Sequence, residues 1–145
     1  MDYSIQKAVE LGVNNIVPVF SQRSVVKLDE KRKDSKTEHW QSVAISACEQ
    51  CGRNRVPDVS VPTKLREYLL KHPLKQDELG LFLDPRGQQS LAEHARPASV
   101  RVLIGPEGGF TDEELKVAKE CGYEPMRLGK RILRTETAGP AVIAA

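Results

Sequence analysis

Residues 103–111 read "LIGPEGGFT", and this stretch decides how the rest of the chain is interpreted. The apolar run "SVRVLIG" at 99–105 leads into it, and three glycines and a proline surround a single acidic residue, Glu107. A helix-start signal follows, because Thr111 is a capping residue and Glu114 stands three positions later as its capping-box partner. The stretch therefore predicts a buried strand, a tight turn and a helix in direct succession.

A glycine-rich turn between strand and helix is typical of phosphate-binding loops, but two fingerprints are missing. A Walker loop needs G-x-x-x-x-G-K-[ST], which neither "GPEGGF" at 105–110 nor "LGKRIL" at 128–133 supplies. A Rossmann turn needs G-x-G-x-x-G, and the spacing here differs. Glu107 inside the turn would repel a pyrophosphate. Nucleotide-phosphate binding is left as a minor alternative, which predicts stabilisation by ATP.

Outward from this stretch, apolar runs alternate with amphipathic segments along the whole chain. This alternation predicts an α/β domain with a mostly parallel sheet flanked by helices. Pro18 indicates an edge strand or an irregularity, and Pro140 fits a terminal helix only if that helix begins at about Thr137. Strands are expected at 15–20, 59–61, 79–85, 99–105 and 124–129, and helices at 4–12 with Ser4 as the cap, 36–51, 63–72, after Phe110 and at the C-terminus.

The cysteine pair in Cys48-x-x-Cys51 is interpreted as core rather than as a metal or redox site. Only one such pair occurs, and Cys121 is remote in sequence. Both thiols fall on the expected core-facing stripe of the helix at 36–51. The histidines are scattered along the sequence, so no metal is expected. The stripe consists of Trp40, Val43, Ala44, Ala47, Cys48 and Cys51, and the histidines are His39, His72 and His94.

Composition places the chain among soluble globular domains. It has 145 residues, of which 39% are hydrophobic and 29% charged, and its net charge of +2 indicates no bulk attraction to nucleic acid. No apolar run of about 18 residues is present, and "MDYSIQKAVE" lacks the features of a signal peptide. Three cysteines, an odd number, fit a reducing compartment. A cytoplasmic protein without a membrane partner is therefore expected.

Two unusual segments each follow a predicted strand, at the sheet edge where ligands of α/β proteins collect. They are "LIGPEGGFTDEEL" at 103–115 and "LGKRILRTETA" at 128–138. Together with "KAVELG" at 7–12 and "EQCGR" at 49–53, they closely resemble the SPOUT methyltransferase superfamily and, within it, the ribosomal RNA small subunit methyltransferase E family. The resemblance covers nearly the whole chain, and the two long motifs are highly specific.

The resemblance implies a SPOUT fold with a C-terminal deep trefoil knot, a homodimer formed through the knot region, and S-adenosylmethionine as cofactor. Glycine backbone suits such a site, since side chains would block the approach of the ligand to peptide groups. Leu128, Ile132 and Leu133 would line an adenine pocket, although core packing explains them nearly as well. Glu107 bonds a cofactor or RNA group, or only braces the loop. The implied cofactor contacts are Leu83, Gly105, Glu107, Gly108, Gly109, Leu128, Gly129, Ile132, Leu133, Thr135, Thr137 and Ala138.

The implied reaction is methylation of uridine N3 in 16S ribosomal RNA of the small subunit, a step of rRNA processing and ribosome biogenesis. Because the N3 proton must leave, negative charge appears on the ring carbonyls, and a nearby cation stabilises it. Arg134 is the first candidate, with Arg53 reaching in from the partner subunit. Glu136 is either the base or a group that orients Arg134. Arg23, Lys27, Arg55, Lys130 and Arg131 would contact RNA, or are ordinary solvated cations.

Full-length relatives carry an N-terminal PUA-like β-barrel. This sequence begins at a segment that resembles the first helix of the methyltransferase domain. We therefore expect residues 1–145 to form that single domain, with the barrel and the first strand missing. The alternative to an enzyme is a non-catalytic RNA-binding domain that retains the knotted fold.

Overall fold

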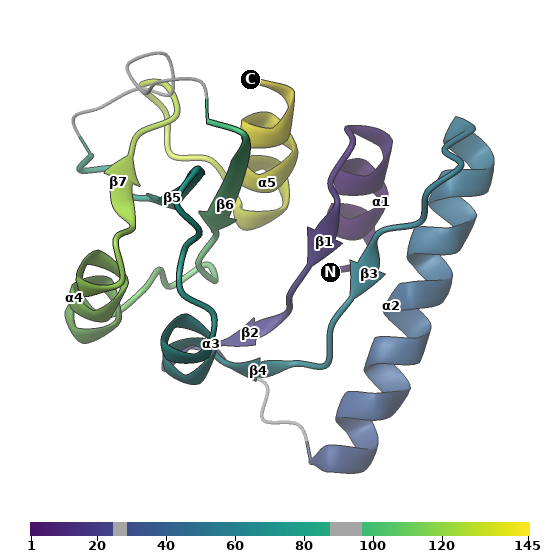
Figure 1. Cartoon of the computed structure of the whole chain (residues 1–145), viewed down its shortest axis with the longest axis horizontal. Coiled ribbons are helices and arrows are strands. Elements are labelled where there is room, and N and C mark those ends of the chain that lie inside the picture. Colours follow the sequence, from purple (N-terminus) through teal and green to yellow (C-terminus); the bar gives the residue numbers. More distant parts are fainter. Residues whose placement is uncertain (25–28, 88–96) are drawn as a thin grey trace.

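The chain folds into alternating helices and strands, as the sequence predicts (Figure 1). The computed structural model describes residues 1–24, 29–87 and 97–145, so Lys27 and His94 lie outside the described residues. The elements in chain order are α1 (Asp2–Glu10), β1 (Asn15–Ile16), β2 (Val19–Phe20), α2 (Glu30–Cys51), β3 (Asp58–Val59), β4 (Thr63–Lys64), α3 (Leu65–Lys71), β5 (Glu78–Leu83), β6 (Ser99–Leu103), α4 (Asp112–Glu120), β7 (Glu124–Met126) and α5 (Thr135–Ala144).

Every strand pair in the described part of the chain is parallel, but the strands form three small sheets instead of one. One sheet has the order β6-β5-β7, and the others pair β1 with β3 and β2 with β4. The register places Ile16 opposite Val59 and Val19 opposite Thr63, so residues 17–18 face residues 60–62. Pro18, which has no N–H to donate, lies in this gap and confirms the predicted irregularity.

The sheet β6-β5-β7 carries helices on both faces, which explains its continuous apolar strands. Phe82 is fully buried on one face, in a cluster that includes Leu65 of α3 and Ala118 of α4. Leu81, the preceding residue, is fully buried on the other face with Val142 of α5. Successive residues of a strand point to opposite faces, so β5 contributes to two cores. Figure 1 shows α5 between this sheet and α1, against which it packs.

The N-terminal half has its own core between α1, α2 and the pair β1–β3. Trp40, Ala44 and Cys48 of the predicted helix stripe are buried in it, together with Val9 of α1. Cys51 is an exception to the predicted stripe, because its side chain is exposed. It is the last residue of α2, where the chain turns away, and its thiol donates to the carbonyl of Cys48 at 3.8 Å.

Several helix boundaries differ from the sequence prediction, and α2 begins at Glu30 instead of at residue 36. Helix α1 begins at Asp2, so Ser4 lies inside it and is not its cap. Helix α5 begins at Thr135, with Arg134 as N-cap, and Pro140 therefore lies inside the helix instead of in its first turn. The carbonyl of Arg134 accepts from the N–H groups of Thr137 and Ala138, both at 2.9 Å, which starts the helix earlier than predicted. Thr63–Lys64, expected to open a helix, pairs as β4.

Candidate functional site

The ends of β5, β6 and β7 meet at one edge of their sheet, since parallel strands end at the same side. The backbone N–H of Asp84, just after β5, donates to the carbonyl of Met126 at the end of β7, at 3.0 Å. Gly87 is buried against the same segment, and a Cβ there would lie 3.0 Å from the carbonyl carbon of Met126 and 3.1 Å from the nitrogen of Arg127. The turn after β5 therefore rests directly on the backbone that follows β7.

One hydrogen bond joins the two diagnostic motifs. The hydroxyl of Thr135, the first residue of α5, donates to the carbonyl of Gly105 at 3.0 Å. The glycine-rich loop, defined here as residues 105–110, thus lies beside the N-terminus of α5. The prediction that these two motifs come together is confirmed for this pair of residues.

The glycine-rich loop and the loop after β7 both expose bare backbone. Gly109 and Gly129 have positive φ angles of 68° and 72°, which L residues rarely adopt, and a Cβ on either would meet nothing within 4 Å. Gly105 is different, since a Cβ there would lie 3.3 Å from the ring of Phe110. Conformation therefore requires the first two glycines, and close packing favours the third.

The start of α4 contains the predicted capping box. The hydroxyl of Thr111 accepts from the N–H of Glu114 at 3.2 Å, and the carboxylate of Glu114 accepts from the N–H of Thr111 at 2.8 Å. The Glu114 side chain also makes a long-range contact that the sequence does not indicate. Its second carboxylate oxygen accepts a hydrogen bond from the N–H of Gln22 at 2.7 Å. Glu114 is only 8% exposed, so this contact is a buried link between distant segments.

Arg53, a catalytic residue that the resemblance implies, and Arg23, one of the predicted RNA-binding cations, both contact backbone carbonyls in this chain. Arg53 donates from Nη1 to the carbonyls of Val9 and Val13, at 2.8 and 2.9 Å, and so holds the end of α1. Arg23 donates from Nη1 to the carbonyl of Gly108 at 2.7 Å. Nothing in the local sequence around either arginine indicates these partners.

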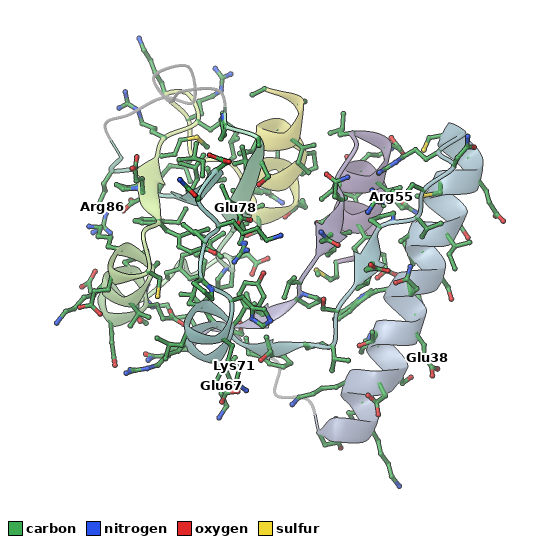
Figure 2. All side chains as sticks on the ribbon, in the orientation of Figure 1. Glu38, Arg55, Glu67, Lys71, Glu78 and Arg86 are labelled. Atoms are coloured by element: carbon green, nitrogen blue, oxygen red, sulfur yellow. The ribbon has the colours of Figure 1, made fainter. Side chains whose placement is uncertain are left out.

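The other predicted RNA-binding cations among the described residues are Arg55, Lys130 and Arg131, and they lie in different parts of the molecule. Lys130 and Arg131 are exposed on the loop after β7. Figure 2 shows Arg55 on the side formed by α1 and α2, across the molecule from Arg86, which follows β5. Because the turn after β5 packs on the segment that follows β7, Arg55 lies on the other side of the molecule from the loop that carries Lys130 and Arg131.

Arg134 and Glu136 flank the N-terminus of α5. Arg134 is exposed, and Glu136 is half-buried in the first helical turn, where the helix dipole favours a negative charge. Neither side chain forms an ion pair or hydrogen bond with another residue of the described ranges. The salt bridge considered for this pair is thus not formed within the described part of the chain.

The remaining predicted cofactor residues differ widely in burial. Leu83 and Leu128 are half-buried and pack against the cluster of Leu81 and Met126, which agrees with the core interpretation of Leu128. Ile132 is 82% exposed, an unusual position for a large apolar side chain. Leu133 is half-buried, Ala138 is buried, and Thr137 and Glu107 are exposed.

Asp84 and Arg86, which sequence reasoning missed, brace the turn after β5. Arg86 donates from its backbone N–H and from Nε to one carboxylate oxygen of Asp84, at 2.9 and 3.1 Å, and from Nη2 to the other at 3.2 Å. Partial burial acts to raise the pKa of Asp84, but the hydrogen bonds and charge of Arg86 outweigh it, so the pKa is lowered. Asp84 therefore stays anionic at neutral pH.

In the described residues, no three His, Cys, Asp or Glu side chains come together in a way that would hold a metal ion. None of the described helices combines the length and the apolar character that crossing a bilayer requires.

Comparison with known proteins agrees with this geometry. The family model described as "RNA methyltransferase domain" matches residues 1–145. The ribosomal RNA small subunit methyltransferase E of Buchnera aphidicola from Schizaphis graminum is 40% identical over 100% of this chain and 58% of its own length. The protein of that name from Bacillus subtilis is 34% identical over 95% of this chain and 57% of its own length.

A solved structure is similar over the same extent. The crystal structure of a ribosomal RNA small subunit methyltransferase E from Neisseria gonorrhoeae, bound to S-adenosylmethionine, is 43% identical with a TM-score of 0.91. The match covers 99% of this chain and 58% of that protein. The chain therefore spans somewhat under three fifths of the length of these relatives. Because the family model matches residues 1–145, the chain belongs to the RNA methyltransferase domain family, and it is similar within that family to the ribosomal RNA small subunit methyltransferases E.

Proposed function

We propose that the chain is the catalytic part of an enzyme that transfers a methyl group from S-adenosylmethionine to N3 of a uridine in 16S ribosomal RNA. The observation that carries the proposal is the contact between the Thr135 hydroxyl and the Gly105 carbonyl, at 3.0 Å. It unites the two motifs at the strand ends, where a ligand of an α/β domain is expected. The names of the relatives support an RNA of the small ribosomal subunit as the substrate.

The residues at the strand ends fit such a cofactor. Gly108, Gly109 and Gly129 offer peptide groups without side chains, and a Cβ on the last two would enter open space. Leu83, Leu128 and Leu133 would supply apolar contacts for the adenine, with the remaining residues of the predicted set around them. When bound, S-adenosylmethionine supplies an electrophilic methyl group on a sulfonium.

Arg134 is proposed to stabilise the charge that develops on the uracil carbonyls as N3 loses its proton. Its guanidinium is exposed, makes no hydrogen bond to a described residue, and stands at the positive end of α5. Glu136, one turn further into α5, is proposed either to accept the N3 proton or to orient Arg134 once RNA is bound. A carboxylate is a weak base for this proton unless its pKa is raised.

A homodimer formed through a knotted C-terminal region is part of the proposal, with Arg53 contributed by the partner subunit. Arg53 uses Nη1 to hold α1, while its Nε and Nη2 make no hydrogen bond to a described residue. These donors are therefore available for a group outside the chain. Lys130 and Arg131 are proposed to contact RNA phosphates, in the cytoplasm where ribosomes are assembled.

A two-part experiment tests the proposal. Calorimetry should detect binding of S-adenosylhomocysteine to the purified chain. Mass spectrometry of 16S rRNA from a strain lacking the full gene should show a missing methyluridine that returns when the gene is restored. RNA binding without any change in methylation would contradict the proposal and favour a non-catalytic RNA-binding domain. Stabilisation by ATP instead of the methyl donor would favour nucleotide binding.

A further inference from the structure

The segment that follows β2 forms a compact turn of its own. The backbone N–H of Ser21 donates to the hydroxyl of Ser24 at 3.0 Å, and the N–H of Ser24 donates to the carbonyl of Ser21 at 3.1 Å. The two hydroxyls are also 3.0 Å apart. Ser21 is 9% exposed, so one end of the turn is buried. The sequence "SQRS" at 21–24 thus closes on itself and presents Arg23 near its tip.

This turn is fastened to the glycine-rich loop and to the start of α4. Arg23 donates from Nη1 to the carbonyl of Gly108 at 2.7 Å, and the same nitrogen lies 3.5 Å from the carbonyl of Phe110. Beside it, the N–H of Gln22 donates to the buried carboxylate of Glu114 at 2.7 Å. Glu114 also accepts from the N–H of Thr111 at 2.8 Å. A single carboxylate therefore binds the backbone of both segments.

The glycine-rich loop needs such external contacts because of its composition. Glycine loses more conformational freedom on ordering than any other residue, so a loop with Gly105, Gly108 and Gly109 is costly to hold in one shape. Hydrogen bonds with a charged partner are stronger than neutral ones. Arg23 supplies one to the middle of the loop, where an internal bond joins only the N–H of Gly109 to the carbonyl of Pro106.

We propose that the Ser21–Ser24 turn is a positioning element that holds the glycine-rich loop in its ligand-binding conformation, with Arg23 as the positioning residue. The inference rests on the proposed function, because that function assigns a ligand to the loop. A loop ordered in advance binds its ligand with less loss of entropy. Arg23 therefore acts on cofactor affinity through Gly108, because its Nη1 donates to carbonyls of the loop.

The test is calorimetric titration of S-adenosylhomocysteine into the wild-type chain and three variants. Arg23→Gln should weaken binding about tenfold, the scale of one lost charged hydrogen bond. Arg23→Lys keeps the charge but not the planar guanidinium, so it should recover only part of the loss. Arg66→Gln is the matched control, because Arg66 also contacts the start of α4, at Glu113 (3.4 Å), but touches no residue of the loop. The affinity of Arg66→Gln for S-adenosylhomocysteine should equal that of the wild type.

Thermal midpoints and RNA binding complete the test. The midpoint of Arg23→Gln should stay close to that of the wild type, since the side chain is exposed. The affinity of Arg23→Gln for a 16S rRNA transcript should depend on salt concentration in the same way as that of the wild type. If Arg23→Gln leaves the cofactor affinity unchanged but weakens RNA binding and lowers its salt dependence, the positioning role is overturned in favour of an RNA contact. If the wild-type chain itself does not bind S-adenosylhomocysteine, the proposed function fails first.

Discussion

The two loops that meet at the strand ends are built in opposite ways. The glycine-rich loop is held from outside by Arg23 at Gly108 and by Thr135 at Gly105, and Glu114 anchors the helix start that follows it. The loop after β7, residues 127–134, exposes four cationic side chains, and none of them bonds to another described residue. These cations are Arg127, Lys130, Arg131 and Arg134.

Under the proposed function, this difference assigns two tasks to the two loops, contact with the cofactor and attraction of the RNA. Contact with a ligand through bare backbone depends on exact placement, so that loop is anchored by buried or charged hydrogen bonds. Attraction of a polyanion acts at a distance and depends on charge more than on geometry. Changes in the first loop or its anchors should therefore alter stability or cofactor affinity, whereas changes in the second should alter catalysis or RNA binding and leave the fold intact.

The largest effect is expected for Arg134→Ala. Loss of a group that stabilises developing charge typically costs about 3 kcal/mol of transition-state stabilisation, or more than a hundredfold in rate. Stability should not change, because the Arg134 side chain is exposed and makes no capping hydrogen bond to α5. The measurement is the initial rate of methyl incorporation into 16S rRNA, with Arg32→Ala on α2 as a control. A rate equal to that of the wild type would remove Arg134 from the mechanism.

Glu114→Ala should produce the next largest effect, on stability. It removes a capping-box partner and leaves the N–H groups of Gln22 and Thr111 without their acceptor. We expect the free energy of unfolding to fall by about 2 kcal/mol. Urea denaturation measures this, and Glu113→Ala at the exposed neighbouring position should change it by less than about 0.5 kcal/mol. Equal effects for the two variants would contradict the anchoring role.

Gly109→Ala should have a smaller effect, of about 1 kcal/mol on the free energy of unfolding, because an L residue is strained at its φ of 68°. Space is not the cause, since a Cβ there meets nothing within 4 Å. Gly108→Ala is the matched comparison, because its φ is not positive and its Cβ would make an ordinary contact with Arg23 at 3.5 Å. If Gly108→Ala proved the more destabilising of the two, packing and not conformation would limit the loop.

The smallest effect is expected for Lys130→Gln, and only on RNA binding. If Lys130 neutralises one phosphate, its loss should reduce the slope of log affinity against log salt concentration by about 0.7 to 0.9. Unfolding should be unchanged, since Lys130 is exposed. Filter binding of a 16S rRNA transcript over a range of salt measures the slope, with Lys71→Gln on α3 as the control. An identical slope for both variants would leave Lys130 as a solvated cation.

Much of the fold could be predicted because its signals are local or periodic. The capping box depends on residues three positions apart, and Thr111 and Glu114 form it as predicted. Continuous apolar runs correctly indicated that β5 and β6 are parallel strands of a sheet covered on both faces. Because parallel strands end at one edge, the meeting of Gly105 with Thr135 could also be anticipated.

Other features override the local signals. Pro140 predicts a helix that begins near Thr137, yet α5 begins at Thr135 and contains the proline. Packing of Ala138 and Val142 into the core maintains this helix although Pro140 lacks an N–H to donate. Likewise Cys51 continues the apolar spacing of α2 but is exposed, because the helix ends there. The predicted knot depends on threading, which hydrophobic periodicity does not encode, and it stays a prediction.

The sequence by itself determined the α/β class, the order of the main helices and strands and the identity of the two motifs, since these follow from spacing along the chain. Only the tertiary structure decided what anchors the glycine-rich loop. Arg23 reaches Gly108 across 85 residues and Gln22 reaches Glu114 across 92. Such contacts form only when separate strands and helices pack together. The local sequence around a residue does not show whether its side chain will take part in such a contact or stay exposed to solvent.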